Sequence, residues 1–302
     1  MKQIVILSGK GGTGKTSVTA AFAHLAVSGA GQRRAVLVDA DVDASNLELV
    51  LSHQVLETNA FQGGQVAQID PELCEGCGVC ADLCRFEAID SHDGVYTVDP
   101  IACEGCALCF YQCPTEAVRM EEQVAGQWFR SQSRYGPLFH AALWPAQENS
   151  GKLVTLVKQQ GRLLAMDEGH DLVLVDGPPG IGCPVISAAA GADLALIVTE
   201  PTAAGIHDME RARAMTKHFG VPALVCINKT DLYPEGTAEI EACCERDGLP
   251  VVGHIPFETV VTEAMVQGQP VTVYQPDGPV SQALRLAWKR VLAAINDQEV
   301  KV

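Results

Sequence analysis

Short apolar runs recur along the chain and alternate with longer stretches in which apolar residues follow helical spacing. The first run, residues 4–7, is followed by an alanine-rich stretch over residues 17–27 whose apolar positions recur about once per helical turn. Short buried strands separated by helices are typical of a mostly parallel sheet with helices on both faces. The pattern therefore predicts an α/β fold, with further strands at residues 34–39, 171–176, 194–199, 223–228 and 250–255.

The periodic pattern stops near residue 61 and resumes after about residue 125. We therefore predict a sheet domain in two parts, residues 1–60 and 126–302, with a separate α+β domain inserted at residues 61–125. In the second part we expect a short strand at residues 127–129, a turn at 134–137 and a helix at 150–166 whose end is interrupted by Gly161. A chain of 302 residues suits one main domain with an insertion.

A glycine-rich loop joins the first predicted strand to the first predicted helix. Its sequence from Gly9, G-K-G-G-T-G-K-T, fits the phosphate-binding pattern G-x-x-x-x-G-K-S/T. In that pattern backbone N–H groups and the helix N-terminus surround the phosphates, the lysine reaches the terminal phosphates, and the last hydroxyl binds Mg²⁺. We therefore predict a nucleotide site formed by Gly11, Gly12, Thr13, Gly14, Lys15, Thr16 and Ser17.

Acidic or amide side chains follow three of the predicted strands. Asp39, Asp41 and Asp43 come at and after the end of the second strand, while Asp176 and Asn228 each end a later strand. The carboxyl ends of parallel strands meet at one edge of a sheet, where open α/β sheets bind their ligands. We expect these side chains to lie beside the glycine-rich loop. For Asp43, a capping role and a catalytic role are both compatible with the sequence.

Two features make the chain resemble the deviant Walker A ATPases, the family of MinD, ParA, Mrp-type carriers and the nitrogenase iron protein. They are the second loop lysine, Lys10, and the D-G-P-P-G run that begins at Asp176, which resembles the switch II segment of the family. The resemblance implies a P-loop ATPase that forms a homodimer when ATP binds. It implies that Lys10 reaches the nucleotide of the partner subunit and that Lys10 and Lys15 stabilise the transition state. Taken alone, Lys10 is equally compatible with a solvated loop charge.

The same resemblance implies roles for the polar residues at the strand ends. Asp41 would orient the attacking water, Asp176 would hold Mg²⁺ through water together with Thr16, and Asn228 would contact the adenine. The match covers nearly everything outside the insertion. It is closest to the MinD-superfamily ATPases that carry an inserted ferredoxin domain.

The inserted region contains a duplicated cysteine motif. The spacing C-x₂-C-x₂-C-x₃-C occurs twice within residues 74–113, and Arg85 replaces the proline expected after the first copy. This is the pattern of bacterial two-cluster ferredoxins, in which the fourth cysteine of each copy binds the cluster of the other copy. Zinc ribbons instead use two separated C-x₂-C pairs. We therefore predict two 4Fe-4S clusters, one on Cys74, Cys77, Cys80 and Cys113 and the other on Cys103, Cys106, Cys109 and Cys84.

The charge of the chain is acidic and concentrated in the insertion. The formal net charge is −16, and twelve acidic residues against two arginines between Asp70 and Glu122 place 10 of those negative charges in that segment. Nonspecific nucleic-acid binding and adhesion to anionic membranes depend on Lys and Arg, so we predict neither. We expect a redox or metalloprotein partner with a basic docking patch. The alternative is that the acidic surface only keeps the domain soluble.

The remaining sequence features predict where the protein is located in the cell and whether it is anchored in a membrane. The chain has no run of about 18 apolar residues, its start is not that of a signal peptide, and its twelve cysteines fit metal ligands and free thiols in the reducing cytoplasm. The last predicted helix has apolar residues from Val280 to Ile295 and ends in the acidic run N-D-Q-E at residues 296–299. We therefore expect it to pack on the ATPase domain and not to anchor the protein in a membrane.

Together these features predict an ATPase that couples its nucleotide state to electron transfer through the two clusters toward a metalloprotein. Two alternatives are a MinD-like regulatory ATPase that senses redox state and a carrier that donates iron-sulfur clusters. The sequence also gives expectations for three cysteines outside the two motifs. We expect Cys183 to be a buried free thiol, and the adjacent Cys243 and Cys244 lack the C-x-x-C spacing that Mrp-type carriers use.

Overall fold

The structure, a computed structural model, describes residues 1–29, 32–92, 94–145, 147 and 149–297. The chain divides into two compact units, Met1–Asn59 with Trp128–Ala142 and Ser150–Val302, and Ala60–Gln127 with Leu143–Asn149. Residues 143–149, which we predicted to belong to the second part of the sheet domain, therefore group with the smaller unit. The boundary between the units falls inside two strands, β3 and β6, each of which has residues in both units.

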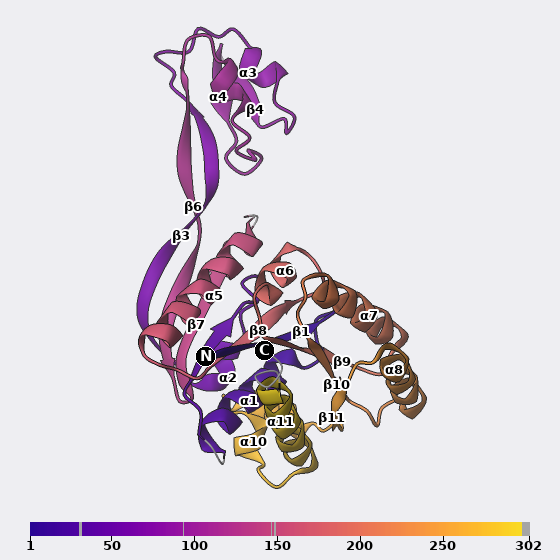
Figure 1. Ribbon diagram of the computed structural model, residues 1–302. Helices are drawn as coiled ribbons and strands as arrows, with labels where there is room; N and C mark the ends of the chain where they lie inside the picture. Colours follow the sequence, from indigo (N-terminus) through magenta and orange to yellow (C-terminus); the bar gives the residue numbers. More distant parts are fainter. Residues whose placement is uncertain (30–31, 93, 146, 148, 298–302) are drawn as a thin grey trace. The chain divides into compact units, whose positions relative to one another are not determined.

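Within the described residues, nine strands form one sheet, and Figure 1 shows its strands β1, β8 and β9 within the larger unit. Its order is β11 (Val251–Ile255), β10 (Ala223–Asn228), β9 (Leu194–Thr199), β1 (Lys2–Ser8), β8 (Leu172–Pro179), β2 (Ala35–Asp39), β7 (Gly136–Leu143), β6 (Val118–Ser133) and β3 (Gln54–Ile69). The strands from β11 to β7 pair in parallel. The six strands predicted from apolar runs are all present, so the predicted α/β sheet is confirmed.

Three strands at one edge differ from the predicted pattern. We expected only a short strand at residues 127–129 and no strand near residue 60, whereas β3 and β6 each span 16 residues and β7 follows β6 after a two-residue turn at 134–135. A turn of this length makes β6 and β7 an antiparallel hairpin. The prediction was wrong here because many side chains of β3 are exposed, so its sequence lacks the apolar run of a buried strand.

Helices cover both faces of the sheet in the larger unit (Figure 1). On one face, Ile4, Leu37 and Leu174 pack with Phe22 of α1 and Trp288 of α11, and the two aromatic rings lie 4.9 Å apart. The opposite face packs against α5, α6, α7 and α8. The helices of this unit are α1 (Lys15–Ser28), α2 (Leu47–Leu51), α5 (Ser150–Asp167), α6 (Cys183–Ala189), α7 (Ala203–His218), α8 (Pro234–Asp247), α9 (Val260–Val266), α10 (Val271–Tyr274) and α11 (Pro279–Asp297).

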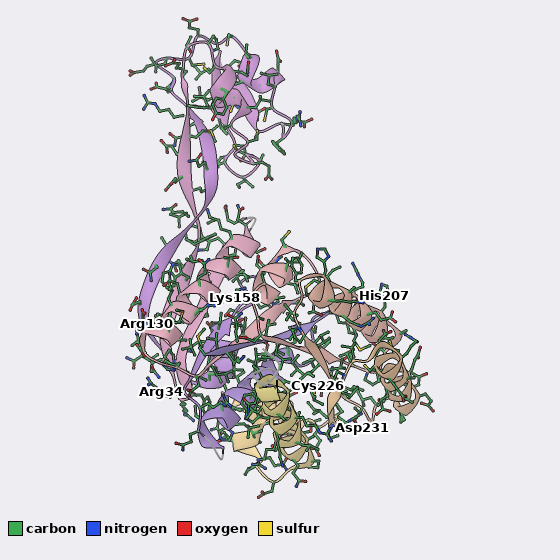
Figure 2. All side chains as sticks on the ribbon, viewed as in Figure 1. Arg34, Arg130, Lys158, His207, Cys226 and Asp231 are labelled. Carbon is green, nitrogen blue, oxygen red and sulfur yellow. The ribbon has the colours of Figure 1, made fainter. Side chains whose placement is uncertain are left out.

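Helix α5 lies close to the sheet and to α6. We expected Gly161 to interrupt the end of this helix, but the helix continues through it to Asp167. The glycine allows α5 to lie close to the sheet, since a Cβ at this position would lie 2.7 Å from Cγ2 of Val38. Lys158, labelled in Figure 2, is buried and donates hydrogen bonds to backbone oxygens at the end of α6, those of Ser187, Ala188 and Ala190. Burial lowers the pKa of Lys158 to about 8. The lysine thereby satisfies carbonyl groups that the helix end leaves without partners.

The C-terminal helix α11 packs on the sheet, as predicted. Val280, Leu284, Val291 and Ile295 are buried in the same cluster as Trp288. Of the acidic run at its end, Gln298 and Glu299 lie outside the described residues. None of the described helices has the length and apolarity needed to cross a membrane.

The smaller unit contains short helices and a separate hairpin. These are α3 (Val79–Asp82), α4 (Leu108–Gln112), β4 (Ile89–His92) and β5 (Val95–Val98). Strands β4 and β5 pair antiparallel, and α3 contacts α4. Helices α3 and α4 occupy equivalent places in the two copies of the cysteine motif, so the sequence duplication is also a structural repeat.

Candidate functional site

The glycine-rich loop leaves β1 and enters α1 at the edge of the sheet that holds the carboxyl ends of its strands. Gly14 precedes the helix with a φ of 94°, in the left-handed region that favours glycine. A Cβ on Gly14 would lie 2.4 Å from Nδ2 of Asn228. The side chain of Asn228 donates from Nδ2 to the backbone oxygen of Thr13 at 2.8 Å. Asn228 therefore holds the loop from the end of β10.

Lys15 is buried beneath this loop. Its Nζ donates to Oγ of Ser8 at 2.8 Å, and Ser8 donates to the backbone oxygen of Lys10 at 2.6 Å. Burial lowers the pKa of Lys15, although the negative charges of Asp176, Asp41 and Asp39 favour its protonated form. The ammonium group of Lys15 and the backbone N–H groups of the loop are the donors that can bind the phosphate oxygens of a nucleotide.

Asp176 and Thr16, the two predicted Mg²⁺ ligands, lie together. Thr16 Oγ1 donates to Asp176 Oδ2 at 2.7 Å, and Thr19 Oγ1 donates to Oδ1 of the same carboxylate at 2.8 Å. Burial and the nearby charge of Asp39 raise the pKa of Asp176. The paired hydroxyl and carboxylate oxygens fit the preference of Mg²⁺ for oxygen ligands, and a cation there would offset the cost of the buried charge.

Asp39 and Asp41 have different environments. Asp39 is fully buried and accepts hydrogen bonds from Ser45 Oγ and from the backbone N–H groups of Asp41, Asn46 and Leu47. It therefore fixes the loop between β2 and α2. Asp41 lines a cavity beside the glycine-rich loop, and burial together with repulsion from Asp39 raises its pKa to about 6. Asp43 is exposed.

A cavity of about 510 Å³ opens beside the loop, entirely within the larger unit. Its walls include the glycine-rich loop, Asp41 and Asn228 on one side and an apolar surface formed by Pro256, Phe257 and residues of α9 on the other. Its volume lies in the range of small-molecule sites. The polar residues and the apolar wall fit the phosphates and the base of a nucleotide, respectively.

Lys10 pairs with a residue of its own chain. Its Nζ lies 2.5 Å from Oε1 of Glu200, and Lys229 Nζ lies 2.9 Å from Oε2 of the same carboxylate. Burial alone would raise the pKa of Glu200, but its hydrogen bonds to the two lysines lower it below the ordinary value. Lys229 also donates to the backbone oxygen of Gly12 at 3.0 Å. Glu200 therefore holds both lysines at the edge of the glycine-rich loop.

In the smaller unit, the eight motif cysteines line two small cavities, four at each. Every one of these thiols is free of disulfide bonds. The remaining lining is largely apolar, with alanine, leucine, isoleucine or valine side chains. The first cavity is lined by Cys74, Cys77, Cys80 and Cys113, and the second by Cys84, Cys103, Cys106 and Cys109. Each cavity thus combines three cysteines of one motif copy with the fourth cysteine of the other.

The backbone around these cavities is tightly turned. Gly78 and Ala107, which occupy the same place in the two motif copies, both adopt the left-handed conformation, with φ of 82° and 60°. Gly105 meets a second constraint, since a Cβ there would lie 2.2 Å from the backbone oxygen of Gln65. Four thiols converging on an apolar cavity are the donor set that 4Fe-4S clusters use. The residues present therefore fit such a cluster at each cavity.

The remaining cysteines differ from one another. Cys183, which we expected to be buried, is exposed at the start of α6, because the loop after β8 carries it to the surface. Cys243 and Cys244 are buried on α8, and burial raises the pKa of Cys244 to about 11. Neutral thiols of this kind are poor metal ligands.

Several residues of the site were not predicted from the sequence. Thr19 lies one helical turn after Thr16, so the i, i+3 spacing on α1 was a usable signal. Glu200 and Lys229 follow β9 and β10, at the edge where ligand residues were already expected. No spacing in the sequence links either residue to Lys10.

Comparison with known proteins agrees with this fold. Residues 4–271 match the family described as CobQ/CobB/MinD/ParA nucleotide binding domain. Uncharacterized protein MJ0578 of Methanocaldococcus jannaschii is 34% identical over 227 residues, which cover 75% of this chain and 78% of that protein. The iron-sulfur cluster carrier protein of Aquifex aeolicus is 28% identical over 142 residues, which cover 43% of this chain and 39% of that protein.

A solved structure supports the same fold. The septum site-determining protein MinD of Pyrococcus horikoshii, complexed with Mg-ADP, superposes with a TM-score of 0.59 and 21% identity, covering 97% of this chain and 98% of that chain. The family match spans most of the chain and includes the glycine-rich loop, Asp41, Asp176 and Asn228. The chain therefore belongs to the CobQ/CobB/MinD/ParA family of nucleotide-binding proteins and is an ATPase.

Proposed function

We propose that this ATPase couples its nucleotide state to electron transfer through two 4Fe-4S clusters toward a metalloprotein partner. The observation that carries the proposal is the pair of cysteine cavities, each lined by four thiols drawn from both motif copies. Clusters bound by four thiolates exchange single electrons at potentials that the protein sets. A complete set of four ligands at each cavity favours a cluster that stays in place during its reaction.

The nucleotide site supplies the ATPase part of the proposal. Lys15 and the glycine-rich loop bind the phosphates, while Thr16 and Asp176 hold Mg²⁺. Asp41, at the wall of the cavity, orients the attacking water and accepts its proton. Asn228 braces the loop and borders the space proposed for the adenine. Lys10 leaves Glu200 and crosses to the nucleotide of the partner subunit in an ATP-dependent homodimer.

Chain connectivity supplies the coupling. The loop held by Asp39 leads into α2, and β3 begins three residues after α2 ends, at Gln54. This strand carries the chain into the cysteine-containing unit. Rearrangement of the loop when ATP binds or is hydrolysed would therefore act on the strand that leads to the cysteines.

The proposed partner carries a basic docking patch. The segment from Asp70 to Glu122 is strongly acidic, and Ile101 and Tyr111 beside the motif cysteines are about three-quarters exposed, at 75% and 76%. Exposed apolar side chains within an acidic surface are typical of transient redox interfaces. We expect this association in the cytoplasm, without nucleic acid or a membrane anchor, and weakening as salt increases.

A carrier of iron-sulfur clusters is the second candidate, favoured by the relatives that are named cluster carriers, such as the one of Aquifex aeolicus. The two functions differ in what happens to iron. The full chain is reconstituted anaerobically, its iron and sulfide are counted, and it is incubated with an apo-ferredoxin with and without Mg²⁺-ATP. Retention of about eight irons per chain supports electron transfer, whereas movement of iron to the apo-ferredoxin supports the carrier.

A further inference from the structure

Two histidines and a glutamate meet in the larger unit, and none of the three lines the nucleotide cavity. Glu48 lies on α2, His53 lies between α2 and β3, and His140 lies on β7, which runs beside β2 in the sheet (Figure 1). One potential ligand atom from each residue lies within 4.8 Å of those of the other two. The carboxylate of Glu48 contacts Nδ1 of His140 directly. Three residues distant in sequence therefore converge on one point.

Hydrogen bonds fix both imidazole rings. Nε2 of His140 lies 2.9 Å from Oγ of Ser131, and Nδ1 of His53 lies 3.0 Å from the backbone oxygen of Glu48. The opposite ring nitrogens, Nδ1 of His140 and Nε2 of His53, remain available to bind an ion between the three residues. Metal-binding histidines are held in this way, since the second ring nitrogen donates to an oxygen atom that fixes tautomer and orientation.

Burial and charge also favour a cation. The His140 side chain is only 5% exposed and stacks on Phe129 with ring centroids 4.9 Å apart. Among the ion pairs of the described residues, Glu48 pairs with His140 and with no lysine or arginine. The carboxylate therefore has no permanent cation beside it.

We propose that Glu48, His53 and His140 bind one divalent transition-metal ion of the Zn²⁺ class, with solvent at the remaining position. Two imidazole nitrogens and one carboxylate oxygen are an established donor set for such ions, and no thiol takes part. Ligands of tetrahedral zinc lie about 3.3 Å apart at bond lengths of about 2.0–2.1 Å. The three atoms already lie within 4.8 Å of one another, so binding requires only that they move to this spacing.

The position of this site gives it a role in the ATPase. Ser45 Oγ donates to Asp39 at 2.9 Å and lies 3.4 Å from Oε2 of Glu48. Asp39 holds the loop that carries Asp41, and α2 follows that loop directly. A metal ion bridging Glu48 on α2 to His140 on β7 therefore ties the end of this loop to the sheet. The site stabilises the fold next to the proposed catalytic loop without touching the nucleotide.

Zinc binding to the full chain, with its clusters assembled anaerobically so that the motif thiols are occupied, tests the proposal. Equilibrium dialysis against Zn²⁺ is compared for the unsubstituted protein, His53→Gln, Glu48→Gln and the matched control His254→Gln. His254 is a suitable control because it pairs with Glu241 at 2.7 Å but is exposed and has no third ligand. We expect one zinc per chain whose affinity falls at least tenfold in the first two variants and is unchanged in the control.

X-ray absorption at the zinc edge of the unsubstituted protein provides a readout that does not depend on how the variants fold. The proposal expects a first shell of nitrogen and oxygen only, with the imidazole signature, and a rise in Tm on adding Zn²⁺ that His53→Gln lacks. A first shell containing sulfur overturns the proposal, because it places the ion on cysteines. Equal zinc binding by the unsubstituted protein and the Glu48→Gln variant overturns it as well.

Discussion

Replacing Asn228 tests how the nucleotide loop is held. Nδ2 of Asn228 donates to the backbone oxygen of Thr13 at 2.8 Å, and its Oδ1 accepts from the backbone N–H of Lys229 at 3.0 Å. Asn228→Ala removes the only side-chain donor to Thr13 that we find in the described residues. A hydrogen bond of this kind contributes about 0.5–1.5 kcal/mol, and a buried acceptor left unpaired costs about 1–3 kcal/mol.

We therefore expect Asn228→Ala to weaken Mg²⁺-nucleotide binding by about 1–2 kcal/mol, a factor of about 5–30. Asn228→Asp should weaken it further, because a carboxylate oxygen would then face the oxygen of Thr13. Asn296→Ala is the matched control, since Asn296 pairs with Arg33 on the protein surface and does not line the nucleotide cavity. Urea unfolding of each variant separates a binding effect from a loss of fold.

Isothermal titration with two ligands distinguishes whether Asn228 holds the glycine-rich loop or contacts the adenine base. If Asn228 acts by holding the loop, Asn228→Ala weakens Mg²⁺-ATP and Mg²⁺-tripolyphosphate by similar factors, because both ligands use the loop. If Asn228 acts only on the adenine, the variant weakens ATP and leaves tripolyphosphate unchanged. The second result would refute the reasoning from the Thr13 hydrogen bond.

Three further predictions concern other parts of the molecule. Cys113→Ser should halve the reconstituted iron from about eight to about four per chain, whereas the exposed Cys183→Ser should keep it, and undiminished iron in the first variant contradicts the shared ligand sets. Glu200→Gln removes the carboxylate that pairs with Lys10. Size-exclusion chromatography should therefore detect the dimer at a lower ATP concentration than for the unsubstituted protein. If the dimer needs the same ATP concentration, the pair with Glu200 does not restrain Lys10. The folded-state pKa of Asp41 is raised from 3.8 to about 6, so the stability it contributes is full below pH 3.8 and is lost as pH rises through 6. Between about pH 4 and 6, the Tm of the nucleotide-free unsubstituted protein should therefore fall relative to that of Asp41→Asn, and a constant difference contradicts the raised pKa.

The sequence predicted those parts of the fold whose signals are local. The apolar runs at residues 4–7 and 172–175 are short and wholly buried, and the glycine-rich loop has fixed spacing because phosphate binding requires it. The pairing of each cysteine motif with the fourth cysteine of the other copy is not local, and it could be predicted only because the duplicated spacing is that of two-cluster ferredoxins. The structure places these four-cysteine groups at the two cavities.

Features that depend on distant residues could not be predicted in this way. Strands β3 and β6 are neighbours in the sheet although the inserted residues separate them in sequence, and β3 exposes many of its side chains, so it lacks the apolar run of a buried strand. Lys10 meets Glu200 only because β1 and β9 are neighbours in the sheet. Glu48 and His140 likewise approach through the packing of α2 near β7. Such contacts are set by topology, and a single sequence carries no periodic signal for them.

A redox titration tests whether the nucleotide state changes the reduction potentials of the clusters. The anaerobically reconstituted chain is titrated under EPR, once with Mg²⁺-ADP and once with a non-hydrolysable Mg²⁺-ATP analogue. A shift of about 59 mV for a one-electron step equals a tenfold change in equilibrium, and linkage requires reduction to change nucleotide affinity by the same factor. The account predicts two 4Fe-4S signals and a shift of at least this size in one of them. Identical potentials with both nucleotides would contradict it.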